Sequence, residues 1–379
     1  MTELDWATVC AVRMERHALT TPTPGIAGAA RAMCGVHAQV MSAAELSLGL
    51  RTGTTRTQVR EALWQHGELV KTFGLRGTVH LLPAADLPLW TAALSAVPLT
   101  VGYAPSLRLT PEQTDAVVAA LDRVCRTGEF TMDELTPAVV AETGSWAGDL
   151  VVPSFSGFWP RWATVIHTAA FRGALCFGPD RDRKTTYTSP HRHLSATPPM
   201  TTEQALAELL RRYLYSYGPA TPAHFARWLS APRPWAERLF ATCRDRLRPV
   251  LLGETEAWLA ADDDFEPTQD APALRLLPYF DAYQVGCHPR ESLFPGKTYL
   301  RALNRGQAGN YPVVLVDGIV AGVWHQRRSG RRIAVTVEPC GRWPAGRRRM
   351  LAEQVDRIAT VLEATAELTV GTVTVGPHA

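Results

Sequence analysis

The chain has 379 residues, of which 46% are hydrophobic and 20% charged, and its formal net charge is +3 at pH 7. This composition is typical of a globular protein of about two or three domains, and it excludes disordered and collagen-like chains. No apolar run approaches the ~20 residues that a membrane-spanning helix needs, so no membrane partner is expected. Because acidic residues stand where a signal peptide needs a basic start and an apolar core, we expect a cytoplasmic protein.

Arginine supplies almost all of the positive charge, since only three of the 39 basic residues are lysines: Lys71, Lys184 and Lys297. Two explanations stay open. A GC-rich genome favours Arg codons together with those for Ala, Gly and Pro, which are also abundant here. Phosphate binding favours arginine as well, because a guanidinium group matches two phosphate oxygens and an ammonium group does not. The positions of the arginines have to separate the two.

Helix and strand signals alternate in the first hundred residues. Ser42-Ala-Ala-Glu45 is a capping-box pattern at the start of an apolar helix, which Gly53 ends. Thr55-Arg-Thr-Gln58 predicts a second helix, and strand-like runs follow at 68–74 and 77–82. Two helices separated by a turn and followed by a hairpin indicate a winged helix-turn-helix.

The same order recurs twice further along the chain. A helix at 111–127 is followed by Gly128-x-x-Thr131 and a second capping box, and a helix at 202–217 is followed by Gly218-x-x-Thr221. The sequence therefore predicts two or three small helical units of about 90 residues each. For a single helix-turn-helix, packing within a globular protein is the favoured explanation. Several in one chain bring nucleic-acid binding level with it, and both explanations stay open.

The character of the sequence changes near residue 260. Residues 262–267 are acidic and rich in turn formers, and β-branched runs follow, with one helix expected at 345–365. The runs lie at 274–283, 311–326, 331–339 and 368–376, with turns expected at 316–319 and 328–331.

The C-terminal segment concentrates positive charge. Residues 301–379 hold eleven arginines against six acidic residues, a local net charge of +5. Arg327, Arg328, Arg331 and Arg332 crowd one hairpin tip. A solvated loop tolerates such a cluster, and a DNA phosphate contact would use it.

The sequence contains no complete motif for binding a metal ion or a nucleotide cofactor. His191-Arg-His193 has no acidic or cysteine partner nearby, and Phe294–Thr298 resembles the end of a P-loop but has Glu291 where the first glycine must stand. The cysteines are odd in number and form no Cys-x-x-Cys pair, so we expect neither disulfides nor zinc, and no cofactor. They are Cys10, Cys34, Cys125, Cys176, Cys243, Cys287 and Cys340.

Six segments, in order, make the chain resemble the tandem winged-helix DNA glycosylases of the AlkZ and YcaQ type. They are residues 36–40, 73–83, 169–179, 211–229, 276–286 and 316–328, so the resemblance covers nearly the whole chain. It implies an α+β fold of three tandem winged helix-turn-helix units and a C-terminal β-rich, barrel-like domain, curved into a DNA-binding channel. The expected boundaries are 1–110, 111–200, 201–265 and 266–379, with the catalytic motif in the first unit.

The catalytic motif of this family is a pair of polar residues around one apolar residue, commonly Gln-x-Gln or Gln-x-Asp. Here it stands as His37-Ala38-Gln39, which resembles a His-x-Gln variant associated with self-resistance in bacteria that make bulky DNA-alkylating antibiotics. Positions i and i+2 share a face only in an extended segment. Since Gly35 can end a helix and Ser42 can start one, residues 36–41 can form such a segment. The alternative is that both side chains only satisfy backbone groups at a helix junction.

The resemblance implies a monofunctional DNA glycosylase that acts as a monomer on double-stranded DNA containing N7-alkylguanine. An alkylated base carries a positive charge and leaves without a general acid, so a Gln39 carbonyl could hold the attacking water and stabilise the oxocarbenium ion. His37 would orient that water or take its proton. We expect DNA contacts from Arg60, Arg76, Arg172 and the arginines of the 327–332 hairpin.

Two alternatives belong to other functional classes. A transcriptional regulator would read bases through the second helix of the first unit, which carries Thr57, Gln58 and Arg60. A damage-binding protein would shield an adduct without cleaving it. The sequence names neither the adduct nor whether the base is flipped out of the duplex.

Overall fold

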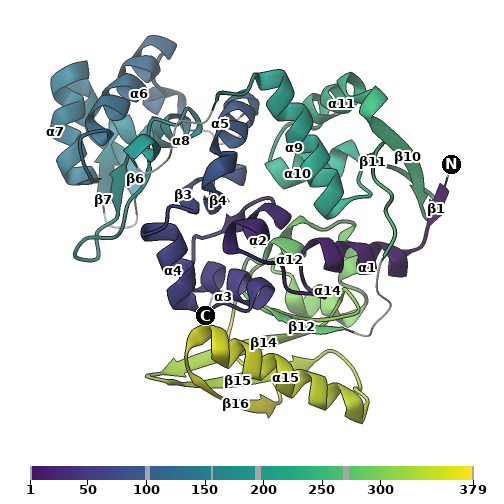
Figure 1. The fold of residues 1–379 in the computed structure, drawn as a ribbon. Helices are drawn as coiled ribbons and strands as arrows, with labels where there is room; N and C mark the ends of the chain where they lie inside the picture. The colour runs from purple at the N-terminus through teal and green to yellow at the C-terminus, as the bar shows by residue number, and fades with distance from the viewer. Residues whose placement is uncertain (1, 99–102, 155–156, 193–197, 268–272, 378–379) are drawn as a thin grey trace. The chain divides into compact units, whose positions relative to one another are not determined.

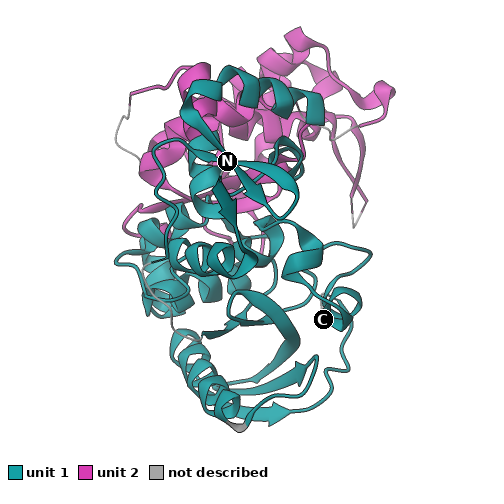
Figure 2. Ribbon diagram, turned by 90° about the vertical axis from the view of Figure 1, so that its right-hand side faces the viewer, with its two compact units in different colours: residues 1–62, 210–228, 233–379 teal, residues 63–209, 229–232 magenta. Residues whose placement is uncertain are grey.

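The computed structural model describes residues 2–98, 103–154, 157–192, 198–267 and 273–377. The chain forms two compact units of mixed helix and strand (Figure 1, Figure 2). Unit 1 comprises residues 1–62, 210–228 and 233–379, and unit 2 comprises residues 63–209 and 229–232. Within the described ranges, no helix is both long and apolar enough to cross a membrane.

The N-terminal part of unit 1 contains β1 (Thr2–Leu4), α1 (Trp6–Arg16), α2 (Ile26–Ala32), β2 (Val36–His37), α3 (Met41–Thr52) and the first residues of α4 (Arg56–Trp64). The expected cap of α4 is confirmed, since Thr55 N–H donates to Gln58 Oε1 at 2.8 Å and Gln58 N–H donates to Thr55 Oγ1 at 3.3 Å. The expected cap of α3 at Ser42 is wrong. Val40 precedes the helix without a side-chain cap, and Glu45 is buried in ion pairs instead.

A three-stranded sheet of unit 1 joins distant parts of the chain. β10 (Leu247–Leu252) pairs antiparallel with β11 (Thr255–Ala260) and parallel with β1. The helices α9 (Thr202–Tyr217), α10 (Pro222–Leu229) and α11 (Arg233–Thr242) precede these strands. The predicted start of α10 is confirmed, because Thr221 Oγ1 accepts from the His224 N–H at 3.2 Å.

The C-terminal part of unit 1 is an open five-stranded sheet in the order β12-β13-β14-β15-β16. Its elements are β12 (Leu274–Leu277), α12 (Ala282–Gly286), α13 (Arg290–Leu293), α14 (Lys297–Ala302), β13 (Val313–Val316), β14 (Ile319–Ser329), β15 (Arg332–Pro339), α15 (Ala345–Leu362) and β16 (Thr365–Val370). The expected strand at 274–283 is wrong beyond Leu277, where the chain turns into α12. The expected turn at 316–319 is confirmed, with Asp317 and Gly318 both at positive φ.

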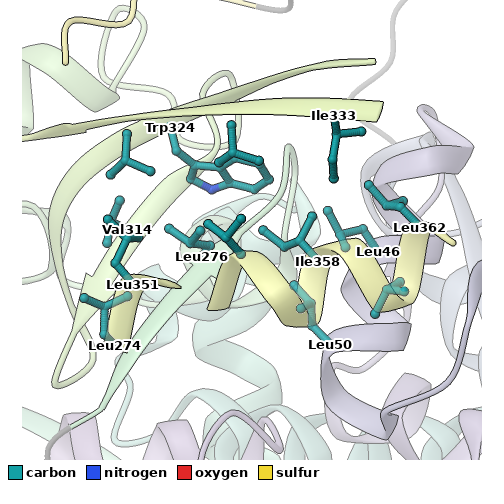
Figure 3. Packing of buried hydrophobic residues seen from close by; sticks show 14 residues of the cluster. Leu46, Leu50, Leu274, Leu276, Val314, Trp324, Ile333, Leu351, Ile358 and Leu362 are labelled. Atoms are coloured by element: carbon teal, nitrogen blue, oxygen red, sulfur yellow. The ribbon is translucent and has the colours of Figure 1, made fainter. Parts of the chain in front are cut away.

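Helix α15 covers one face of this sheet. Figure 3 shows Leu351, Ile358 and Leu362 of α15 pointing toward Trp324 and Ile333 of the strands. Leu46 and Leu50 of α3 enter the same cluster. The helix that follows the His-Ala-Gln segment is therefore part of the C-terminal core.

Unit 2 holds the predicted hairpin of β3 (Leu69–Phe73) and β4 (Val79–Pro83), joined by a 3-10 turn at Leu75–Gly77. The other elements are α5 (Leu87–Ala96), α6 (Pro111–Cys125), β5 (Phe130–Thr131), α7 (Met132–Thr143), β6 (Leu150–Ser154), β7 (Gly157–Pro160), α8 (Ile166–Phe171), β8 (Cys176–Phe177) and β9 (Thr186–Thr188). The predicted capping box of α7 is confirmed: Thr131 N–H donates to Glu134 Oε2 at 2.7 Å.

Candidate functional site

The His-Ala-Gln motif lies in the connection between α2 and α3. Helix α2 ends because Gly35, at φ 97°, turns the chain back and donates its N–H to the Ala30 carbonyl at 2.9 Å. The next two residues, Val36 and His37, form the short strand β2. The chain then bends at Gln39 and Val40, and α3 begins at Met41, so the extended segment expected at 36–41 forms only at its start. Val36 and Ala38 are buried, at 2% and 3% exposure, whereas His37 is half-buried and Gln39 is exposed. Both polar residues of the motif are therefore more accessible than the apolar residues Val36 and Ala38.

The imidazole of His37 packs against the ring of Phe280. The ring centroids are 4.5 Å apart and the planes are inclined by 30°. Phe280 lies in the connection between β12 and α12, far from His37 in sequence, and both belong to unit 1. The tertiary fold thus gives the predicted catalytic histidine an aromatic neighbour.

A buried ion pair anchors the residue that follows Phe280. Arg51 of α3 donates from Nη1 to Asp281 Oδ2 at 2.8 Å and from Nη2 to Oδ1 at 2.9 Å, and both side chains are fully buried. Ser47 Oγ also donates to Asp281. Burial alone would raise the pKa of Asp281, but the Arg51 guanidinium and these hydrogen bonds bring that pKa below its ordinary value. The carboxyl group is therefore ionised at neutral pH.

A second histidine beside this ion pair is held neutral. His17 is fully buried, and its Nε2 lies 3.1 Å from the Ser216 carbonyl. Burial and the Arg51 charge lower the pKa of His17 to about 3. Arg51 Nε donates to the His17 carbonyl at 2.9 Å, so Arg51 links α1, α3 and α12.

Arg60 is engaged by a partner within the protein. Its Nε donates to Glu45 Oε1 at 2.6 Å, and Arg56 lies 3.4 Å from the other oxygen of the same buried carboxylate. The Arg60 side chain is still half exposed. Thr57 Oγ1 donates to Glu363 Oε2 at 2.6 Å, and Gln58 caps the helix. The three side chains that a regulator would use to read bases are thus all bound internally.

The other two predicted arginines before the C-terminal sheet belong to unit 2. Arg76 is half-buried in the 3-10 turn between β3 and β4, in the left-handed region at φ 59°. Arg172 follows α8, is exposed, and donates from Nη1 to Asp115 Oδ1 at 2.5 Å. An exposed ion pair of this kind exchanges easily for a phosphate contact, because it contributes little in water.

The four hairpin arginines lie together at the tip of β14 and β15. Ser329 pairs with Arg332, and Gly330 at φ 59° forms the turn with Arg331. All four side chains are exposed, and no carboxylate of the described residues forms an ion pair with them. Arg328 donates to the carbonyls of Gly330 and Leu362, at 2.9 and 3.3 Å. The structure therefore confirms the hairpin and leaves Arg327, Arg331 and Arg332 facing solvent.

All seven cysteines are free thiols, and six of them are buried. Burial raises the pKa of Cys10 and of Cys176 to about 12, so these thiols stay protonated at neutral pH. In the part of the chain that the structure describes, no three His, Cys, Asp or Glu side chains are grouped so that they could hold a metal ion. His193 lies outside the described residues.

Sequence reasoning missed Phe280, Arg51 and Asp281. Residues 274–283 have the composition of a strand, and the local pattern gives Arg51 no role beyond preceding Gly53, which ends the helix. A signal was present nonetheless, because a charged residue inside an apolar helix and another after an apolar run each need a buried partner. Nothing in the local pattern identifies which residue that partner is.

Comparison with known proteins gives consistent matches. A sequence model of the family described as "DNA glycosylase AlkZ-like" matches residues 30–361. A Streptomyces sahachiroi protein named "Interstrand DNA cross-link repair glycosylase" is 31% identical over 342 residues, which are 84% of this chain and 87% of that protein. The solved structure of Streptomyces sahachiroi DNA glycosylase AlkZ superposes with a TM-score of 0.83 at 27% identity, covering 98% of this chain and 100% of that one.

Proposed function

The chain belongs to the AlkZ-like DNA glycosylase family, and from this premise we propose that it removes cationic N7-alkylguanine from double-stranded DNA. It is a DNA glycosylase, a hydrolase of N-glycosyl bonds. We further propose that bulky, intercalating antibiotic adducts are its main substrates. The enzyme would then serve base excision repair and self-resistance in a producing bacterium.

The observation that carries this proposal is that His37 and Gln39 are both accessible at the end of β2, whereas Val36 and Ala38 beside them are buried. Cleavage at a glycosidic carbon passes through an oxocarbenium-like transition state. An alkylated guanine is already cationic and leaves without protonation, which fits a site with no carboxylate in the motif. The Gln39 carbonyl would accept a hydrogen bond from the water and stabilise the developing cation. The His37 imidazole would orient the water and take its proton.

DNA would be bound by arginine side chains. Arg327, Arg331 and Arg332 are the strongest candidates, because they are exposed and lie next to one another on a hairpin. Further candidates are Arg328, Arg60, Arg76 and Arg172, each of which is at least partly exposed. A monomer would suffice, since one lesion needs one site.

We also propose that residues 1–110, 111–200 and 201–265 each form a winged helix-turn-helix and that residues 266–379 form the C-terminal domain, together lining a DNA channel. The succession of α3, α4 and the β3–β4 hairpin supports the first unit. The succession of α6, α7 and the β6–β7 hairpin supports the second, and α9, α10 and the β10–β11 hairpin support the third.

The test is a duplex with one N7-alkylguanine, in a small and a bulky form. Under single-turnover conditions the wild-type protein should release the base and leave an alkali-labile abasic site. His37→Ala and Gln39→Ala should each slow this step by about 100-fold or more, the usual contribution of a positioned catalytic group. Ser42→Ala is the matched control, because Ser42 is exposed beside the motif and does not cap α3. Cleavage by both variants at the wild-type rate would refute the catalytic assignment.

A further inference from the structure

We propose that Phe280 is a positioning residue for His37, holding the imidazole in the orientation needed for water activation. This inference rests on the proposed catalytic role of His37. The contact itself is an inclined packing of two rings, with centroids 4.5 Å apart. A histidine side chain has two free torsions, and an aromatic neighbour at this distance restricts both. Restricting them matters, because a misplaced catalytic group loses much of its effect.

The conformation of Phe280 indicates a role beyond filling the core. Its φ is 53°, in the left-handed region that bulky residues rarely adopt. Yet its side chain is only half-buried, so the strain is not explained by complete burial of an apolar ring. Strained backbone of this kind persists only where the surroundings impose it, and it is found most often at functional sites.

On one side, the backbone and side chain of Phe280 are held by the loop that contains Gly309. Phe280 N–H donates to the Gly309 carbonyl at 3.0 Å. Gly309 itself has φ 98°, and a Cβ built there would lie 3.0 Å from Phe280 Cδ1 and 3.0 Å from Val285 Cγ2. Only glycine therefore allows the backbone at position 309 to lie so close to Phe280.

The other side is held by the ion pair. Asp281 is bound by Arg51 of α3 through two hydrogen bonds, and it also accepts from the Tyr283 N–H at 3.0 Å to cap α12. Helix α3 begins at Met41, four residues after His37. Both members of the ring pair are thus attached to α3: His37 through the chain, and Phe280 through Asp281 and Arg51. These two connections to α3 hold the rings of His37 and Phe280 next to each other within unit 1.

The experiment combines Phe280 variants with His37→Ala and measures single-turnover base release from the N7-alkylguanine duplex. Phe280→Leu and Phe280→Met remove the ring and should lower the rate constant about 10-fold, less than the loss of a catalytic group itself. Affinity for the intact duplex should stay unchanged. Phe280→Tyr keeps the ring and should retain the wild-type rate. Phe240→Leu, at a buried core position of α11, is the control for loss of packing.

The decisive result is the behaviour in the His37→Ala background. If Phe280 acts through His37, Phe280→Leu and Phe280→Met should have no further effect there, a complete coupling in the double-mutant cycle. In addition, the His37 ring protons should lose an upfield ring-current shift in the NMR spectrum of the Leu variant. An equal loss of rate in both backgrounds, or none in the wild-type background, would overturn the positioning role alone. A His37→Ala protein as fast as wild type would instead overturn the catalytic assignment and this inference with it.

Discussion

The buried ion pair between Arg51 and Asp281 yields a quantitative prediction. In Asp281→Asn the carbonyl oxygen can still accept from Arg51 Nη2 and from Tyr283, which lie 2.9 and 3.0 Å from Oδ1. The new amide group replaces Oδ2, however, and faces Arg51 Nη1, a donor, at 2.8 Å. The variant therefore loses one of the two hydrogen bonds of the pair and leaves a fully buried guanidinium without a countercharge.

Removing one partner of such a pair costs about 3–5 kcal/mol, because the remaining charge stays in a medium that solvates it poorly. We expect the free energy of unfolding to fall by this amount at pH 7. Since the folded-state pKa of Asp281 lies below the unfolded value of about 3.9, its contribution is complete above pH 4 and disappears as the pH falls through the folded-state pKa. The difference between wild type and variant should therefore narrow below pH 4.

Urea unfolding followed by tryptophan fluorescence, with hydrogen exchange of the α3 and α12 amides, measures this loss. Asp115→Asn is the matched control, because Asp115 and Arg172 form an exposed pair whose loss should cost less than about 1 kcal/mol. A loss below 1 kcal/mol in Asp281→Asn, or a loss that does not diminish in acid, would show that the pair does not stabilise the fold as argued.

Three further predictions concern other parts of the chain. Burial lowers the pKa of His17 to about 3, so His17 should make the free energy of unfolding fall by about 1.4 kcal/mol for each pH unit below pH 6.5. In urea unfolding at pH 4–7, His17→Asn should remove this contribution to the pH dependence of the free energy of unfolding. Replacing both Arg331 and Arg332 by alanine should make the plot of the logarithm of the DNA-binding constant against the logarithm of salt concentration less steep, by about 1.8 in slope. An unchanged slope would mean that neither arginine contacts phosphate. Gly49→Ala should cost about 1–3 kcal/mol in thermal unfolding, because its Cβ would meet Val361 and lie 2.7 Å from the Thr54 carbonyl; an unchanged melting temperature would contradict this.

Local physics explains which parts of the fold the sequence predicted correctly. The caps at Thr55 and Thr131 and the turn at Asp317 depend on side chains and backbone within four residues of one another. The end of α2 before the His-Ala-Gln motif is of the same kind, because Gly35 donates its N–H to the Ala30 carbonyl.

Long-range contacts explain the errors. Glu45 has the spacing of a capping box, but in the folded chain its carboxylate is buried against Arg56 and Arg60, so it serves the junction of two helices instead. Residues after Leu277 have the composition of a strand, but Asp281 is drawn to Arg51 and caps α12. In both places an ion pair formed on folding outweighs a weak local preference.

The sequence alone was enough to predict the family, several of the helices and hairpins, and an extended start to the His37-Ala38-Gln39 motif. Only the tertiary structure placed Phe280 against His37 and joined Arg51 to Asp281. The physical reason is that these pairs lie more than 200 residues apart in the chain, and that burial of a charge specifies the need for a partner without specifying its identity.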